Sequence, residues 1–107
     1  MPLIKLEFDN KIVNENEAKT LAEAIKHIVS SATGIKDVFV YGNSAEIGID
    51  IAPIEIFVEM KASLIMDQDK LIADIKSQLS VWKKESNFSH PINLTLIPMN
   101  WKVEIGI

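Results

Sequence analysis

The 107-residue chain contains no cysteine and no arginine, and its 11 basic residues are all lysine. Without cysteine there can be no disulfide, thiolate nucleophile or cysteine metal site. Nucleic acids are typically bound by basic stripes and bidentate arginine contacts, which a chain of net charge −4 without arginine does not offer. No apolar run approaches the roughly 18 residues that a membrane-spanning helix needs. We therefore expect a protein that binds neither nucleic acid nor membrane.

The rest of the composition is that of one ordinary globular domain spanning residues 1–107. Hydrophobic residues make up 48% of the chain and charged residues 24%, proportions that disordered chains do not have. Patterned sequence begins at residue 3, with no secretory leader before it, so we expect a cytoplasmic protein.

The beginning of the chain is typical of a strand followed by a helix. Alternating apolar residues predict a strand over 3–8. Asn14 and Glu17 have the spacing of a helix-capping box, and an apolar stripe of helical period then runs to Ala32. Gly34 is placed to end that helix in the left-handed conformation.

Two more strands are expected in the middle of the chain. Residues 37–41 are rich in β-forming side chains, and 42–44 have the composition of a turn. Residues 45–51 fit either a short edge strand or an ordered loop. The nearly continuous apolar segment 54–60 predicts a strand in the centre of the sheet.

The last third predicts a second helix and a last main strand. Asp67 or Asp69 can cap the helix, which is expected to end near Ser86. Alternation over 92–96 predicts the strand, and Pro98 is expected to stop it.

A shift of 50 residues places one half of this pattern on the other. The shift carries Ile4, Leu6 and Phe8 onto Ile54, Ile56 and Val58. We therefore predict an α+β fold of two βαβ units, a four-stranded mixed sheet with both helices on one face. A ferredoxin-like βαββαβ arrangement is the alternative. Either leaves one sheet face uncovered and partly apolar, which favours an oligomer.

Pro2 is the residue best suited to chemistry. Initiator methionine is normally removed before proline, so the mature chain would begin with a secondary amine at the start of a strand. An α-amino group ordinarily has a pKa of about 8, closer to neutrality than that of lysine. Burial or a neighbouring lysine would lower this pKa further, and a base poised near neutral pH suits proton abstraction beside a carbonyl.

An amino-terminal proline before a strand, a helix ending in Ala32-Thr33-Gly34, and a second βαβ unit together resemble the tautomerase superfamily. The most similar branch contains macrophage migration inhibitory factor and the carboxymethyl-hydroxymuconate isomerases. The resemblance implies a homotrimer with a central β barrel. It also implies a cofactor-independent isomerase whose Pro2 moves a proton on a keto–enol or unsaturated oxo acid, in a pocket between subunits.

The resemblance also suggests which residues bind the substrate. Lys36 matches a family lysine, and the backbone around Ser63, in the segment Ala62–Ile65, matches a supplier of an N–H to substrate oxygen. Where many family enzymes use arginine for a carboxylate, Lys36, Lys61 or Lys102 would have to serve, without bidentate geometry. Asn93 occupies the strand where the branch often has a tyrosine and an asparagine.

The remaining polar, ionisable and aromatic residues have structural interpretations that are more common than catalytic ones. Tyr41 belongs to the predicted turn and could line the pocket. Glu55 and Glu59 could be paired catalytic carboxylates, but ion pairs with lysines across strands are the more common arrangement. His27 and His90 share no local motif, so no metal site is expected. We expect Trp82 in the core and Trp101 at a neighbouring subunit.

Two other functions stay open. The chain could be an inactive protein of the tautomerase fold, or a ferredoxin-like oligomeric module for ligand binding or assembly in which Pro2 is incidental. The absence of arginine keeps the inactive alternative open.

Overall fold

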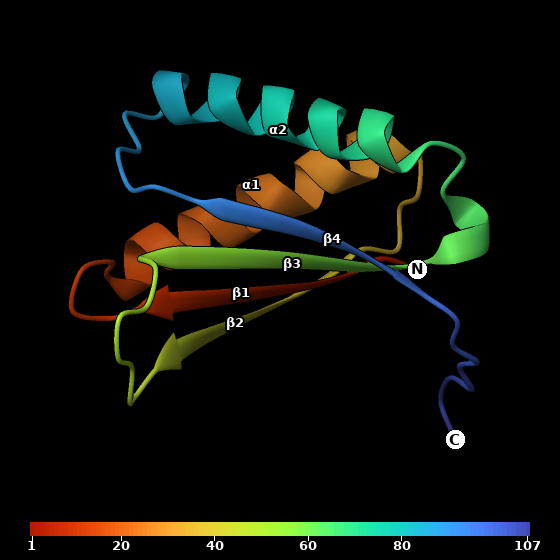
Figure 1. The fold of residues 1–107 in the computed structure, drawn as a ribbon, viewed down its shortest axis with the longest axis horizontal. Coiled ribbons are helices and arrows are strands. Elements are labelled where there is room, and N and C mark those ends of the chain that lie inside the picture. The colour runs from red at the N-terminus through yellow and green to blue at the C-terminus, as the bar shows by residue number, and fades with distance from the viewer.

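Four strands form one sheet, and two helices lie together on one of its faces (Figure 1). This computed structural model describes residues 1–107. In chain order the elements are β1 (Leu3–Asp9), α1 (Glu15–Thr33), β2 (Phe39–Ala45), β3 (Ile54–Lys61), the 3₁₀ turn η1 (Ala62–Leu64), α2 (Gln68–Glu85) and β4 (Asn93–Met99). The predicted fold class, two βαβ units with a mixed sheet and both helices on one face, is confirmed.

The strand order is β2-β1-β3-β4. β1 is parallel to β2 and β3 is parallel to β4, while the central strands β1 and β3 run antiparallel. In a ferredoxin-like split βαβ unit, another strand separates the two parallel strands. Here the parallel strands of each unit are direct neighbours, so the ferredoxin-like alternative is wrong.

The register of the central strands matches the internal repeat. Leu6 lies opposite Ile56, the residue that the repeat makes its counterpart. The flanking pairs are Ile4 with Val58 and Phe8 with Ile54. The two βαβ units are therefore related by a pseudo-two-fold axis that passes between Leu6 and Ile56.

Local capping determines where the helices begin and end. The Asn14 side chain accepts a hydrogen bond of 2.8 Å from the Glu17 backbone N–H, and the Glu17 carboxylate accepts one of 3.1 Å from the Asn14 N–H. Gly34 ends α1 with φ 72°, a conformation that costs glycine little. α2 is capped by Asp67, whose carboxylate accepts from the Lys70 N–H at 3.0 Å.

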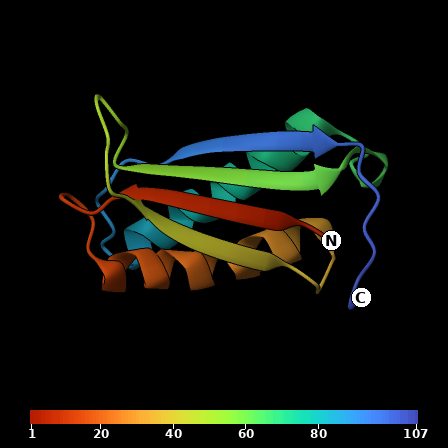
Figure 2. The ribbon, with the colours of Figure 1, turned by 90° about the horizontal axis from the view of Figure 1, so that it is seen from below.

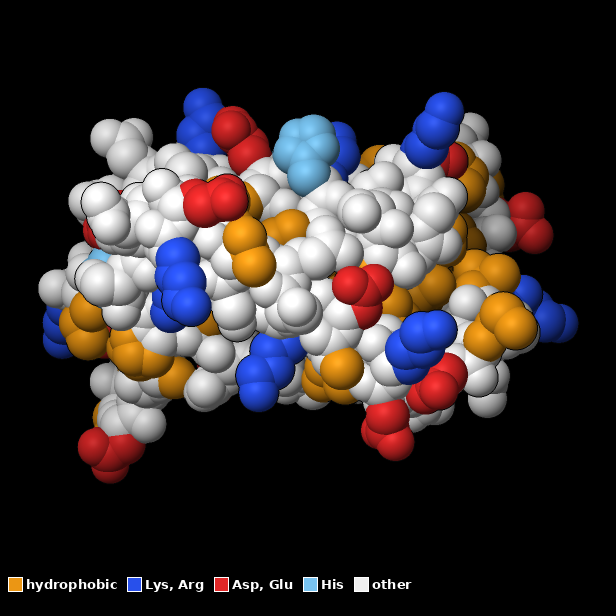
Figure 3. All heavy atoms as spheres, turned by 90° about the horizontal axis from the view of Figure 1, so that it is seen from above, with side chains coloured by type: hydrophobic (Ala, Val, Ile, Leu, Met, Phe, Trp, Pro, Cys, Tyr) orange, Lys and Arg blue, Asp and Glu red, His pale blue; other side chains and the backbone are white.

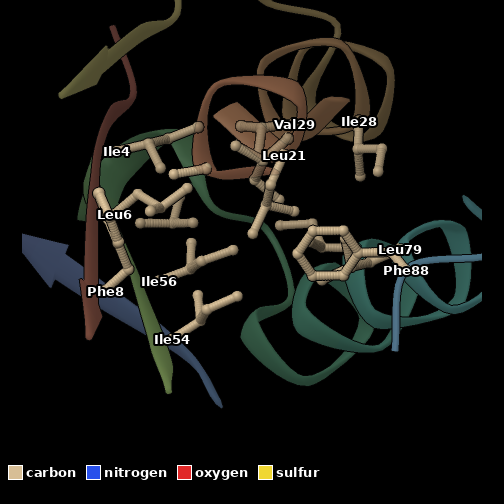
Figure 4. Packing of buried hydrophobic residues seen from close by; sticks show 14 of the residues in the cluster. Ile4, Leu6, Phe8, Leu21, Ile28, Val29, Ile54, Ile56, Leu79 and Phe88 are labelled. Carbon is tan, nitrogen blue, oxygen red and sulfur yellow. The ribbon is translucent and has the colours of Figure 1, made fainter. Parts of the chain in front are cut away.

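The core fills the space between the sheet and the two helices (Figure 4). Alternate residues of the central strands point to this side, and the helices supply Leu21, Ile25 and Leu79. Trp82 packs at the margin of the core with its ring 5.2 Å from that of Phe88, as expected for a core residue. The opposite sheet face carries no helix (Figure 2).

Two predicted strand ends are wrong. Residues 42–44 do not form a turn but continue β2 as far as Ala45, because each residue pairs with β1. Pro98 does not stop the last strand, and pairing of β4 with β3 extends to Met99. β4 is an edge strand, where a missing N–H can face solvent without loss of a ladder hydrogen bond.

Residues beyond Ala45 form a loop rather than an edge strand, which settles the alternative left open for 45–51. This loop lies at the end of the sheet opposite the N-terminus (Figure 1). It therefore cannot cover Pro2 of its own chain. Neither helix has the length and hydropathy that crossing a membrane would require.

Candidate functional site

The amino terminus lies at the end of the sheet where β1 and β2 begin and β3 and β4 finish (Figure 1). Pro2 is less than 2% exposed, on the helix-facing parity of β1. Its carbonyl oxygen accepts a hydrogen bond of 3.1 Å from the Phe39 N–H. The first strand and its parallel partner therefore fix the position of the proline backbone.

A groove of about 410 Å³ opens in front of this terminus. Met1 is half-buried and lines the groove together with Lys61 and the tail residues Trp101, Lys102, Val103, Glu104 and Ile105. The tail passes beside the N-terminus across the strand ends (Figure 2). Because the Pro2 nitrogen is bonded to Met1, removal of Met1 would leave a free amine next to this groove.

Three of the predicted binding residues belong to the same end of the sheet as Pro2. Lys61 is the exposed last residue of β3 and lines the groove. Ser63 follows in η1, also exposed. Lys36 is exposed in the connection between α1 and β2, three residues before the Phe39 N–H that holds Pro2. The fold thus brings two lysines and one hydroxyl to the end of the sheet that carries the amino terminus.

The other two predicted binding residues lie elsewhere in the chain. Tyr41 is 58% exposed on β2, opposite Lys5 and inside the strand rather than in a turn. Asn93 begins β4 opposite Glu55, six residues along β3 from Lys61 and therefore about 20 Å away. Neither Tyr41 nor Asn93 lines the groove beside Met1 of its own chain.

The two glutamates of β3 are occupied by neighbours across the strands. Glu59 Oε2 lies 2.9 Å from Lys5 Nζ, although the Glu59 side chain is only 11% exposed. Glu55 Oε1 accepts a hydrogen bond of 3.0 Å from the Asn93 side-chain amide. The cross-strand ion pair that the sequence favoured over catalytic carboxylates is therefore present at Glu59.

The two histidines have different surroundings. His27 is exposed on α1. His90 Nε2 lies 2.7 Å from Glu17 Oε2 and ties the chain before β4 to the start of α1. Hydrogen bonds from the Asn14 backbone and from His90 hold the pKa of Glu17 below its ordinary value. No group of three or more His, Cys, Asp or Glu side chains is arranged to hold a metal ion.

A second, smaller hollow of about 220 Å³ lies between the end of α1 and the start of α2. It is mainly apolar, with Met60, Ile65 and Leu71 in its walls and Lys70 at its margin. Pro2 does not line it. This hollow is separate from the groove beside Met1.

The tail contributes more to the groove than the sequence indicates. The sequence suggests Lys102 for carboxylate binding and Trp101 for a subunit contact, but it assigns no role to Val103 or Glu104. The signal that could have found Val103 is the alternation of Trp101, Val103 and Ile105 after the last strand, which marks an extended segment with one apolar side. No such pattern singles out Glu104.

No protein-family model matches the chain, and no curated protein matches its sequence. Solved structures do match its fold. Malonate semialdehyde decarboxylase superimposes with a TM-score of 0.68 over 98% of this chain and 92% of its own, at 11% identity. A fused 4-OT that forms an asymmetric trimer gives 0.64 over 94% and 91%, at 13% identity. Macrophage migration inhibitory factor from Oncomelania hupensis gives 0.58 over 92% and 74%, at 17% identity.

These three proteins are tautomerase superfamily members, and each match extends over more than nine-tenths of this chain. At such low identities, the agreement concerns the path of the backbone and not the residues of the site. The resemblance that the sequence suggested is confirmed at that level: the chain has the fold of the tautomerase superfamily.

Proposed function

We propose that the chain is a cofactor-independent tautomerase or isomerase in which the nitrogen of Pro2, freed by removal of Met1, is the general base. The observation that carries the proposal is the position of Met1 in a groove with Lys61 and Trp101, directly before a buried Pro2. Removal of one residue would place a secondary amine beside a space large enough for a small oxo acid.

The chemistry needs only one proton to move. The Pro2 nitrogen takes a proton from the carbon next to a carbonyl, or from the hydroxyl of an enol, and becomes a cationic ammonium. The electron pair left behind spreads onto the carbonyl oxygen or along a conjugated system. The ammonium then returns the proton to another carbon or to oxygen, so that the product is an isomer of the substrate and the amine is regenerated.

The surroundings suit an anionic oxo acid. Lys61 and Lys102 line the groove as point charges that can attract a substrate carboxylate, and Lys36 lies at the same end of the sheet. The proposal requires the uncharged form of the amine, which nearby cations and partial burial favour. Ser63, at the turn after β3, is proposed to offer an N–H to a substrate oxygen.

We propose a homotrimer for the assembly. The uncovered sheet face has Phe39 and Tyr41 about half exposed, with Leu3 and Phe57 beside them, and exposed apolar side chains gathered on one face favour contact with another chain. A second copy packed there could bring its own Tyr41 or Asn93 towards a neighbour's Pro2. The fused 4-OT of the same fold is a trimer, which supports a trimeric assembly here. A cytoplasmic location is also part of the proposal.

An inactive assembly protein of the same fold is the second candidate. It is favoured by the complete absence of arginine, since lysine cannot bind a carboxylate in the bidentate geometry of a guanidinium. In that case the trimer would form and no isomerisation would occur.

The experiment that tests the base begins with the intact mass of the purified protein, which shows whether Met1 is absent. Ketonisation of a phenylenolpyruvate-type enol is then followed by ultraviolet absorbance for the processed chain, for Pro2→Ala, and for a chain with lysine inserted between Met1 and Pro2. The insertion keeps the proline as an amide and is the matched control for blocking.

The processed chain is expected to turn over the substrate. Pro2→Ala should lower kcat/KM by about 10²–10⁴, and the blocked chain should be as inactive as buffer. Lys61→Ala and Lys102→Ala should raise KM more than they lower kcat. Retention of Met1, or equal rates for the processed and blocked chains, would remove Pro2 from the mechanism and leave the inactive assembly protein.

A further inference from the structure

The loop between β2 and β3 exposes three isoleucines. Ile47 is 90% exposed, Ile49 84% and Ile51 41%, and the acidic residues Glu46 and Asp50 are exposed in the same short segment. We refer to residues 46–51 as the isoleucine loop. So much aliphatic surface on one short loop is unfavourable in water and is typical of a contact surface.

The isoleucine loop has a defined local shape. A Cβ atom added at Gly48 would lie 2.5 Å from the Ile51 side chain, so the loop backbone packs closely against that isoleucine. Just beyond the loop, the Pro53 carbonyl accepts a hydrogen bond of 3.0 Å from the Asp9 N–H. The loop is therefore held at its base and projects its outer isoleucines away from the core.

A groove runs along the opposite edge of the sheet, between α2 and β4. It has a volume of about 400 Å³, and Ile72, Leu79, Ile92 and Leu94 form its apolar walls. Lys76 and Lys83 stand at its margin, and Lys84 lines an adjoining hollow that shares Lys83. We refer to these two hollows together as the lysine groove.

The lysine groove is basic in an acidic protein. No acidic side chain is among the residues that line either hollow, whereas the whole chain has a net charge of −4. Lys83 is fixed there because its Nζ donates a hydrogen bond of 2.6 Å to the His90 carbonyl oxygen. Over the helix-covered face as a whole, lysine and carboxylate side chains are interspersed (Figure 3). The groove thus combines apolar walls with unneutralised positive charge.

We propose that the isoleucine loop of one copy of this chain docks in the lysine groove of a second copy. The loop supplies what the groove lacks: Ile47 and Ile49 to cover the apolar walls, and Glu46 and Asp50 to pair with lysines. Matching of apolar and oppositely charged surfaces gives a contact both affinity and orientation. This contact does not depend on the chemistry proposed for Pro2.

The positions of the two surfaces determine the kind of assembly. The isoleucine loop follows β2, the lysine groove flanks the start of β4, and these strands form opposite edges of the sheet at the same end. The contact is therefore head-to-tail, and repeating it produces a closed ring or an open filament. A closed ring of this kind would leave the amino-terminal groove of every copy at the other end of the sheets.

The carboxy-terminal tail is a rival occupant of the groove. Val103, Ile105 and Ile107 are also exposed, but the tail carries one lysine and one glutamate and so has no net side-chain charge to match the groove. It also lies at the other end of the sheet. Charge and position both favour the isoleucine loop.

The test is a charge-reversal cycle on the full chain, read by sedimentation velocity over a range of protein concentrations. Lys76→Glu with Lys84→Glu should weaken self-association about tenfold or more, and Glu46→Lys with Asp50→Lys should do the same. All four changes together should restore association to within about threefold of the unmodified chain. Added salt should weaken the unmodified assembly.

Matched controls separate docking from folding. Lys19→Glu with Lys26→Glu reverses two exposed charges on α1, away from the groove, and should leave association unchanged. Ile49→Asp should weaken association about tenfold or more while the circular dichroism spectrum stays constant, because the side chain is exposed within one copy.

The proposal would be overturned if either double charge-reversal variant associated as strongly as the unmodified chain. It would also be overturned if the variant with all four substitutions did not recover association. So would loss of assembly on truncation after Asn100 together with normal assembly of Ile49→Asp, since the tail would then hold the copies together. Turnover of the enol is measured separately on the same proteins. A chain that assembles without turnover would refute the Pro2 mechanism and leave the docking contact intact.

Discussion

Lys5→Met tests how the uncovered sheet face tolerates a nearly buried carboxylate. Lys5 Nζ lies 2.9 Å from Glu59 Oε2, the Lys5 side chain is 48% exposed, and that of Glu59 is 11% exposed. Methionine preserves most of the length of lysine and removes its ammonium. Glu59 would then lose the cation that faces it, in a site that water reaches poorly.

The magnitude follows from the two exposed fractions. Removal of one partner from a fully buried ion pair costs about 3–5 kcal/mol, whereas an exposed pair contributes about 1 kcal/mol or less. Water can enter the space left by the half-exposed Lys5 and hydrate Glu59 in part. We therefore expect Lys5→Met to lower the free energy of unfolding by about 1–2 kcal/mol.

Urea unfolding at pH 7 measures this difference, at one fixed protein concentration because assembly also contributes to stability. With a urea m-value of about 1–3 kcal/mol/M, the midpoint should fall by about 0.5–1.5 M. Lys5→Met combined with Glu59→Gln should recover most of the loss, because no charge is then left unpaired. Lys11→Met, on an exposed lysine, should change stability by less than about 0.5 kcal/mol.

A loss below about 0.5 kcal/mol for Lys5→Met would refute the reasoning. Strict additivity of Lys5→Met and Glu59→Gln would refute it as well, because a real ion pair must appear as a coupling between the two changes.

Two further changes test the core and the helix cap. Leu6→Ala removes a fully buried side chain at the centre of the sheet and should lower the free energy of unfolding in urea by about 3–5 kcal/mol. Val81→Ala, at a half-exposed helix position, should lower it by less than about 1 kcal/mol. Similar losses for both variants would contradict the assigned core. Because Asn14 and His90 lower the pKa of Glu17 in the folded state, ionised Glu17 stabilises the fold above its ordinary pKa of 4.5, and this contribution disappears as pH falls through the lower folded value. Thermal unfolding should therefore show Glu17→Gln less stable than the unmodified chain at pH 5, with a difference that narrows as the pH is lowered further. A difference that does not narrow would count against the capping box as its source.

Much of the fold could be predicted because its signals are local. Asn14, Glu17 and Gly34 act within a few residues of the helix ends they control, so the bounds of α1 follow from short-range hydrogen bonds and backbone conformation. The repeat of apolar spacing between the two halves is also visible in the sequence, and it correctly predicts which residues of β1 and β3 face the helices.

The errors arise where pairing between strands outweighs local preference. Gly42 and Asn43 have the composition of a turn, but a parallel partner strand stabilises them in extended conformation. Pro98 is tolerated because β4 has a free edge. Neither the partner strand nor the edge position can be read from the residues themselves.

In the candidate site, too, some residues could be predicted from the sequence and others depend on the tertiary structure. Position and residue type are enough to single out Pro2, and the structure places Lys36 and Lys61 at the same end of the sheet. The groove itself depends on the tail, since Trp101 and Val103 meet Met1 only because the tail after β4 passes across the strand ends to the start of β1 (Figure 2). Tyr41 and Asn93 remain predictions that a contact between copies has to test.

Short-range signals in the sequence are sufficient to predict the helix ends, the apolar faces and the presence of a proline that processing could expose. These properties depend on a few neighbouring residues and on a regular period. The folded arrangement was needed to establish that the parallel strands are direct neighbours and that the tail adjoins the amino terminus. It also placed the isoleucine loop and the lysine groove on opposite edges of one sheet. Those arrangements depend on contacts between residues far apart in the chain, whose energies no local pattern encodes.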